Sequence, residues 1–320
     1  MRIGVICSAG SGGGNRFGAV CDMILEKWAE HTIISVSGFG GEYLPGAVLP
    51  DVGEHSYIDR INLAVTSLID AGAQMLTLLG GDGTAAYVAD ALIHSGNNNL
   101  PLFGLAMGTA NVGPIISHDA FERGIPPVGR LQTKRAGTVE ALDGDLHTAY
   151  AFNDVVIGDT MLATFENEMI TADARILALE GRTVPKPPAA CIAEELAIEK
   201  NGRRNVSALP QIAQIIASPI ERDNLYGRAV TGVLCFSPHS DHKAALLLSP
   251  QPVVTMEQSE YGYGALAAAE QMLFREGDRI EITGVRENAM IIADGNPYRR
   301  QNKTIGLRYM PDMVTIAYDR

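Results

Sequence analysis

The sequence contains few cysteines, which argues against the folds that depend on them. Its 320 residues include only four, and no two of them stand as a Cys-x-x-Cys pair. Disulfide frameworks and structural zinc sites use closely spaced cysteines, so neither is expected here. Widely separated thiols fit a reducing compartment, and we expect the protein to be cytoplasmic.

Positive charge and long apolar runs are also missing. The 25 lysines and arginines are outnumbered by 37 aspartates and glutamates, which gives a net charge of -12. No broad basic surface is therefore expected for nucleic acid or for an anionic membrane. The apolar run within residues 1–7 is too short for a signal peptide or a membrane span. We expect neither a targeting segment nor stable membrane association.

The sequence does contain enough apolar material for a sizeable core. Hydrophobic residues make up 46% of it, and its length favours two domains. Residues 1–130 alternate strand-like and helix-like patterns, which predicts an α/β, Rossmann-like domain with a parallel sheet. Residues 131–320 predict a β-rich, mainly antiparallel substrate domain whose last segment packs back on the first domain. We expect the active cleft between these two domains.

The hydrophobic pattern places the individual elements. In the first domain it predicts strands at 2–7, 32–36, 74–79 and 100–105, and helices at 17–28, 58–69 and around 87–92. In the second domain it predicts strand-like segments at 149–157, 169–179, 229–236, 245–248, 279–283 and 290–293. Three strands of the first domain end in loops of small residues, at positions 8, 80 and 106. In an open parallel sheet these carboxyl ends share one edge, where ligands bind, so the loops are expected to converge.

The strongest single motif is the segment Gly80-Gly81-Asp82-Gly83-Thr84. It lies between a buried strand and a helix, where glycines let the backbone turn and a ligand approach, and where helix N–H groups can bind phosphate. A carboxylate in such a cradle would repel phosphate unless it holds a cation, accepts a proton from an attacking hydroxyl, or bonds a sugar hydroxyl. The alternative is a plain Gly-Asp-Gly turn, with Thr84 as a helix cap.

Two further candidates lie in the second domain. Asn153 and Asp154 are a polar pair that interrupts an apolar segment, and burying them costs stability unless they have partners. They therefore either face the cleft or form a bend in an edge strand. Asp294 and Gly295 follow the apolar run 289–293, so Asp294 has either a chemical role or a place in a hairpin turn.

With these motifs in order, the chain resembles the superfamily that joins NAD kinases to diacylglycerol and sphingosine kinases. The resemblance spans about residues 2–297, and its overall pattern is most similar to the bacterial ATP-NAD or AcoX-type kinases. It rests on four segments: Gly80–Thr84, Gly108-Thr109-Ala110-Asn111, Asn153–Ile157 and Asp294-Gly295. The NAD kinase run Ser-Ala-Gly-Gly-Pro and the lipid-kinase continuation Asp-Phe-Ala-Arg are both absent, and 229–238 and 112–115 stand in their places.

The resemblance implies roles for individual residues. Asp82 is the first candidate for the catalytic residue and for an indirect Mg²⁺ contact, and Asp294 is the alternative general base. Asn153 and Asp154 are implied to bind the substrate. The residues implied to bind nucleotide or phosphate are Ser8, Gly10, Ser11, Gly12, Gly80, Gly81, Gly83, Thr84, Gly108, Thr109 and Asn111. A flexible turn is the alternative for residues 10–14, where neither Gly-x-Gly-x-x-Gly nor a P-loop is complete.

These expectations combine into one hypothesis with two alternatives. ATP and Mg²⁺ bind at the glycine loops, and an aspartate prepares a hydroxyl of a small-molecule acceptor, NAD first, for attack on the γ-phosphate. The resemblance also implies a homo-oligomer. The alternatives are a lipid kinase that acts on a diacylglycerol-like acceptor and a nucleotide-binding regulator without catalysis. A Rossmann dehydrogenase is disfavoured, because Asn15 occupies the last glycine position of its fingerprint.

Overall fold

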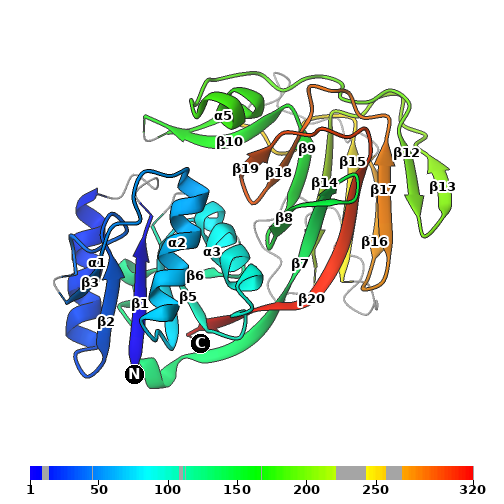
Figure 1. Cartoon of the computed structure of the whole chain (residues 1–320). Coiled ribbons are helices and arrows are strands. Elements are labelled where there is room, and N and C mark those ends of the chain that lie inside the picture. The colour runs from blue at the N-terminus through cyan, green and yellow to red at the C-terminus, as the bar shows by residue number, and fades with distance from the viewer. Residues whose placement is uncertain are drawn as a thin grey trace. The chain divides into compact units, whose positions relative to one another are not determined.

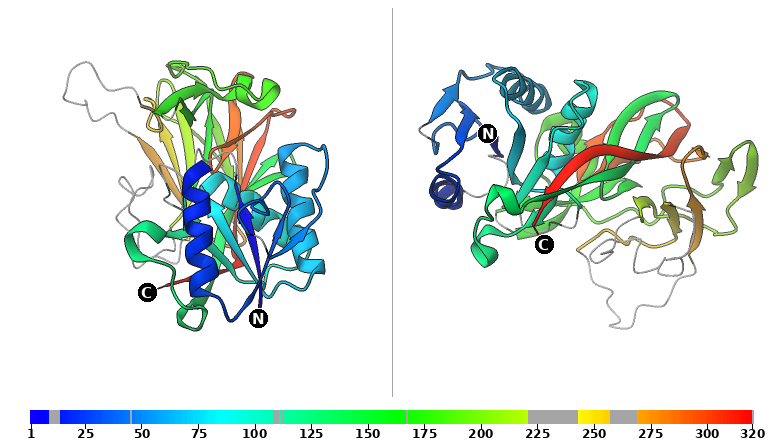
Figure 2. Two further views of the ribbon diagram at one scale, coloured as in Figure 1. Left: turned by 90° about the vertical axis from the view of Figure 1, so that its left-hand side faces the viewer. Right: turned by 90° about the horizontal axis from the view of Figure 1, so that it is seen from below.

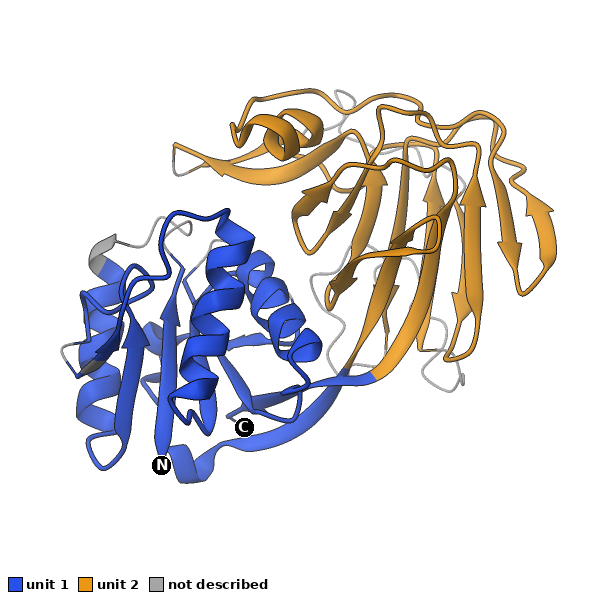
Figure 3. Ribbon diagram, viewed as in Figure 1, with its two compact units in different colours: residues 1–136, 312–320 blue, residues 137–311 orange. Residues whose placement is uncertain are grey.

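A computed structural model shows the chain as two compact units (Figure 3). One unit comprises Met1–Ala136 with Asp312–Arg320, and the other comprises Gly137–Pro311. Strands β7 (Gln132–Asp143) and β20 (Ile305–Tyr318) each run from one unit into the other (Figure 1). The structure describes residues 1–8, 14–44, 46–107, 111, 113–166, 168–220, 243–256 and 269–319.

The first unit is built on a parallel sheet. Its strands follow the order β3-β2-β1-β4-β5, and each neighbouring pair is parallel. Strand β6 and the C-terminal part of β20 also pair in parallel with β5. The bounds are β1 Arg2–Cys7, β2 Thr32–Val36, β3 Ala47–Leu49, β4 Met75–Gly80, β5 Leu102–Ala106 and β6 Ile116–His118.

Helices cover both faces of this sheet (Figure 2). Side chains alternate along β1, so Ile3 and Val5 join a core with α1 (Gly14–Lys27), whereas Gly4 lies against Leu68 of α2. Helix α2 (Tyr57–Asp70) packs beside α3 (Asp82–His94). Two short helical segments follow β6, α4 (Ala120–Arg123) and η2 (Val128–Arg130). Among the described residues, no helix has the length and apolar character to cross a membrane.

The second unit consists mainly of antiparallel sheet. One sheet has the strand order β16-β15-β14-β9-β18-β19. A second set of strands has the order β13-β12-β17-β20 and also contains the antiparallel pair β7 and β8. Strands β10 and β11 form a separate hairpin. The bounds are β8 Leu146–Ala151, β9 Val155–Gly158, β10 Thr160–Phe165, β11 Glu168–Asp173, β12 Ala197–Lys200, β13 Arg203–Val206, β14 Gln214–Pro219, β15 Ala244–Ser249, β16 Glu270–Phe274, β17 Arg279–Thr283, β18 Met290–Ala293 and β19 Asn296–Tyr298.

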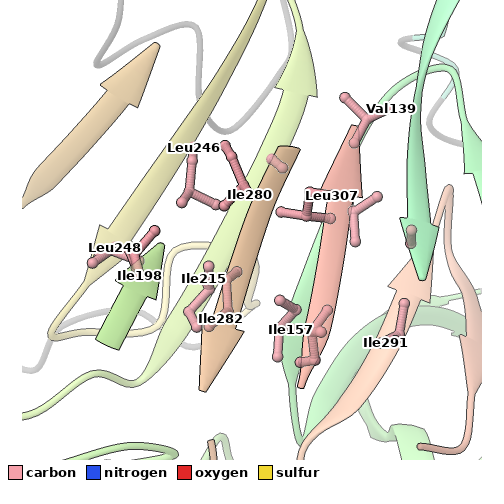
Figure 4. Packing of buried hydrophobic residues seen from close by; sticks show 14 of the residues in the cluster. Val139, Ile157, Ile198, Ile215, Leu246, Leu248, Ile280, Ile282, Ile291 and Leu307 are labelled. Carbon is pink, nitrogen blue, oxygen red and sulfur yellow. The ribbon is translucent and has the colours of Figure 1, made fainter. Parts of the chain in front are cut away.

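An apolar core joins the two sets of strands in this unit (Figure 4). Ile157 of β9 and Ile215 of β14 enter it from one sheet, and Ile282 of β17 and Leu307 of β20 enter it from the other. All four side chains are essentially inaccessible to solvent. Burial of this size stabilises the sheets by roughly 1.5–3 kcal/mol for each large aliphatic side chain, and so supports the loops at their ends.

The structure confirms the predicted fold class, a mixed α/β fold with a parallel-dominated sheet and a separate antiparallel sheet. The predicted segment 169–179 is wrong as a continuous strand. Strand β11 stops at Asp173, whose carboxylate accepts the N–H groups of Arg175 and Ile176 and so begins helix α5 (Ala174–Glu180). The predicted segment 229–236 lies outside the described residues.

Candidate functional site

The glycine motif lies between β4 and α3, as predicted. Strand β4 ends at Gly80, Gly81 is the N-cap residue, and Asp82 is the first residue of α3. The Gly81 position makes no side-chain capping bond, so the helix start is shaped by backbone alone. The predicted capping role of Thr84 is wrong, because Thr84 lies inside the first helical turn and not before it. The turn therefore presents a carboxylate and a hydroxyl at a helix N-terminus.

Three strand ends meet at this turn. Cys7 of β1 pairs with Leu79 of β4, and Gly80 pairs with Ala106 of β5. The chain segments that leave these strands therefore start from one edge of the sheet, which confirms the predicted convergence at its described positions. The Met107 N–H also donates to the Gly80 carbonyl at 3.0 Å. Of the loop residues predicted to bind nucleotide, Gly10, Ser11, Gly12, Gly108 and Thr109 lie outside the described part of the chain.

Asp82 is held by the loop that follows β5. Its Oδ2 accepts the backbone N–H of Gly113 at 2.9 Å. A Cβ atom on Gly113 would stand 2.8 Å from Oδ1 of Asp82, so the absence of a side chain there lets the carboxylate and the loop approach closely. On the same loop, Oδ1 of Asn111 lies 3.5 Å from the position that a Cβ on Gly81 would occupy. The carboxylate is therefore oriented before any ligand binds.

Three hydroxyl groups form a cluster near the start of α3, and we call Ser8, Tyr57 and Thr84 the hydroxyl cluster. The Ser8 and Thr84 hydroxyl oxygens are 2.8 Å apart, and the Tyr57 phenol oxygen is 2.9 Å from Ser8 and 3.3 Å from Thr84. Ser8 follows β1, Tyr57 begins α2, and Thr84 is in α3, so three separate elements supply the cluster. The sequence analysis missed Tyr57, whose one signal is its place directly after the helix cap Ser56.

The donor set of this turn fits a hard divalent cation. Asp82, Asn111 and the hydroxyl cluster offer carboxylate, amide and hydroxyl oxygens, which are the ligand types that Mg²⁺ takes in nucleotide sites. The nearby Cys7 does not add a nucleophile. A hydrogen bond with Cys21, at 3.9 Å between the sulfur atoms, and burial together raise the pKa of Cys7, so it stays a neutral thiol. The chemistry available at this turn is thus that of oxygen groups.

In the second unit, Asn153 and Asp154 lie in a bend. The predicted strand 149–157 is interrupted, because β8 ends at Ala151 and β9 begins at Val155. The bend is therefore observed, but not in an edge strand, because β9 lies between β14 and β18 in its sheet.

Asp294 lies directly against that bend. It occupies a two-residue turn between β18 and β19 with φ of 48°, followed by Gly295 with φ of 78°, so the hairpin interpretation is confirmed. Its carboxylate accepts the backbone N–H groups of Phe152, Asn153 and Asp154 at 2.8, 2.8 and 3.0 Å. Two motifs that are about 140 positions apart in sequence thus form one structural feature.

Comparisons with known proteins place the fold. No protein-family model matches the chain. A stretch of 118 residues is 32% identical to an uncharacterised protein of Archaeoglobus fulgidus, over 37% of this chain and 34% of that protein, so the match spans about a third of the relative. The crystal structure of yeast NADH kinase complexed with NADH is similar over 99% of this chain and 82% of that one, with a TM-score of 0.54 and 13% identity. At that identity the likeness shows an NAD kinase-like fold.

Proposed function

We propose that the chain is a kinase that transfers the γ-phosphoryl group of ATP to a hydroxyl of a small soluble acceptor, with NAD as the first acceptor to test. The observation that carries this proposal is the fixed carboxylate of Asp82, which the Gly113 N–H holds at the start of α3, the helix that also supplies Thr84 to the hydroxyl cluster. A phosphate-binding turn with a preorganised carboxylate has the parts that phosphoryl transfer needs.

In this proposal each residue has a defined task. The Gly80–Gly81 turn and the N-terminus of α3 receive the ATP phosphates, and the hydroxyls of Ser8 and Thr84 donate to phosphate oxygens. Asp82 accepts the proton of the attacking hydroxyl or orients it for in-line attack. Mg²⁺, when bound with ATP, would neutralise the charge of the phosphates; Thr84 and Asn111 would hold it, with Asp82 in indirect contact.

The acceptor side of the proposal uses the second unit. Asn153 is buried in the bend and presents an amide, which can accept a hydrogen bond from a sugar hydroxyl. We assign the chain to the ATP-NAD or AcoX-type branch on the order of its motifs. The same resemblance supports a homo-oligomer, and the widely spaced cysteines fit a cytoplasmic location.

The first experiment measures NADP formation from NAD with ATP and Mg²⁺, using wild type, Asp82→Asn and a control. Asp70→Asn is the matched control, because Asp70 is an exposed aspartate at the end of α2 in the same unit. We expect Asp82→Asn to lower turnover at least about a hundredfold, the usual contribution of a general base, while Asp70→Asn keeps it. Equal turnover in wild type and Asp82→Asn would refute the assignment. ATP binding without NADP formation in wild type would indicate a different small hydroxyl acceptor or a regulator, and sedimentation with liposomes would indicate the lipid-kinase alternative.

A further inference from the structure

Asn153 is fixed at its backbone, whereas its amide oxygen is left for a ligand. The residue is 8% exposed, and Oδ1 has no hydrogen-bond partner among the described residues. The backbone is held on both sides, because its N–H donates to Asp294 and its carbonyl accepts the Ser218 hydroxyl at 2.6 Å. A buried amide oxygen without a partner destabilises the fold, and a bound donor would remove that cost.

Asp294 is occupied by the bend that contains Asn153. Three backbone N–H groups donate to its two carboxylate oxygens, and its own N–H donates to the Asp154 carbonyl at 3.0 Å. A carboxylate has about four acceptor positions, so most of them are already used. The side chain is 6% exposed, which removes it from bulk water. These contacts are suited to holding a loop rather than to abstracting a proton.

Ser218 holds the same bend from the opposite side of Asn153. It lies in β14, next to β9 in the sheet, and its side chain is fully buried. Its hydroxyl reaches across to the carbonyl of Asn153. Asp294 therefore fixes the N–H side of residue 153 and Ser218 fixes the C=O side.

We propose that Asp294 and Ser218 are positioning residues, which hold the Asn153–Asp154 bend so that the Asn153 amide oxygen receives a hydroxyl of the acceptor. The ligand class is a polyhydroxylated small molecule, such as the ribose of a dinucleotide, because its O–H groups donate where Oδ1 accepts. Asp294 then acts on acceptor binding and leaves proton transfer to Asp82. This inference rests on the proposed function, since it assigns the acceptor to the Asn153 side.

The test uses Asp294→Asn with a matched control. Asparagine keeps one acceptor oxygen, and its NH₂ group replaces the second oxygen, so one of the bonds to the bend, such as that from the Phe152 N–H, is lost. Asp143→Asn is the control, because Asp143 is also buried in this unit and accepts two backbone N–H groups, from Gln301 and Asn302 at 2.6 and 2.9 Å. The control removes the same kind of contact from a different loop.

Hydrogen–deuterium exchange of the peptide that covers residues 150–155 gives the first readout. We expect exchange at least about tenfold faster in Asp294→Asn than in wild type, and unchanged in Asp143→Asn. Kinetics with NAD, ATP and Mg²⁺ give the second readout. We expect the KM for NAD to rise about tenfold in Asp294→Asn, while the pH profile of kcat keeps the shape that it has in wild type.

Two results would overturn the inference. The first is unchanged hydrogen–deuterium exchange in Asp294→Asn. The second is a pH profile of kcat that loses its acidic limb while the KM for NAD stays constant, because that is the behaviour expected when a general base is missing. If Asp294→Asn does not fold, Ser218→Ala is tested in its place. We expect this variant to show faster exchange of residues 150–155 and a higher KM for NAD than wild type. A KM equal to that of wild type would refute the inference. A wild type that phosphorylates nothing overturns the proposed function, whereas the exchange comparison still decides whether Asp294 orders the bend.

Discussion

Adding one methyl group at Gly113 should displace the carboxylate of Asp82. A Cβ on Gly113 would stand 2.8 Å from Oδ1, 3.0 Å from Cγ and 3.3 Å from Oδ2 of Asp82. Ordinary contact begins near 3.4 Å, so the carboxylate must move by about 0.6 Å or rotate away. Gly113 is buried, and its φ lies outside the left-handed region, so alanine adds crowding without backbone strain.

The magnitude follows from two opposing effects on stability and one on catalysis. Overpacking costs about 1–3 kcal/mol, and replacing glycine by alanine returns about 0.4–1 kcal/mol by restricting the unfolded chain. We therefore expect Gly113→Ala to lower the free energy of unfolding by about 0–2.5 kcal/mol. If Asp82 is the general base that we propose, a displacement of this size should lower turnover by about tenfold to a hundredfold, because phosphoryl transfer depends on positioning.

Gly129→Ala is the matched control for this experiment. Gly129 is in the same unit, its φ is also outside the left-handed region, and a Cβ there meets no atom within 4 Å. Equilibrium unfolding and kcat for NADP formation are measured for both variants and wild type. A Gly113→Ala protein with turnover within about twofold of wild type would refute the argument that the Asp82 carboxylate must keep this position.

Two further predictions concern one hydroxyl and one buried carboxylate. Tyr57→Phe keeps the ring but removes the phenol oxygen from the hydroxyl cluster. We expect the Kd for ATP-Mg, measured by calorimetry, to rise about threefold to tenfold, while the stability measured in urea stays unchanged. An unchanged Kd would contradict a role of Tyr57 in phosphate binding. Burial acts to raise the pKa of Glu140, but hydrogen bonds and charge from His147 and Arg308 outweigh it and hold the pKa below its ordinary value. The stabilisation by Glu140 is therefore fully present above about pH 4.3 and is lost as pH falls through the lower folded-state pKa. Urea unfolding should show that Glu140→Gln is less stable than wild type by about 1–3 kcal/mol at pH 7, and that this difference shrinks below pH 4. A difference that does not change with pH would contradict a stabilising role of the Glu140 carboxylate.

The local features of the Gly80–Thr84 turn could be predicted because they depend on neighbouring residues. Residues 74–94 contain a buried strand, a Gly-Gly turn and a helix. The strand and the helix each have a hydrophobic period, and the turn has its glycines, so the sequence shows all three directly. The N-cap of α3 is Gly81, three residues before the expected Thr84 cap, and Gly81 has no side chain to mark the helix start. In the second unit the same reasoning missed α5. Its N-cap, Asp173, lies inside an apolar segment, where one aspartate has little effect on the hydrophobic pattern.

The contacts within the candidate site could not be predicted, because backbone groups supply many of them. Asp82 is held by an N–H that is 31 positions away, and Asp294 by three N–H groups about 140 positions away. Every residue except proline carries that donor, so no motif marks the partner. Gly113 and Ser218 were therefore missed as parts of the site.

By itself, the sequence determined the α/β fold class, the order of the main strands and helices, and the carboxylate at a glycine turn. These follow from hydrophobic periodicity and turn chemistry, which act over a few residues. Only the tertiary structure decided which groups meet: Tyr57 with Ser8 and Thr84, and Asp294 with the Asn153 bend. Such meetings depend on sheet order and strand register, which bring distant segments together at a strand end.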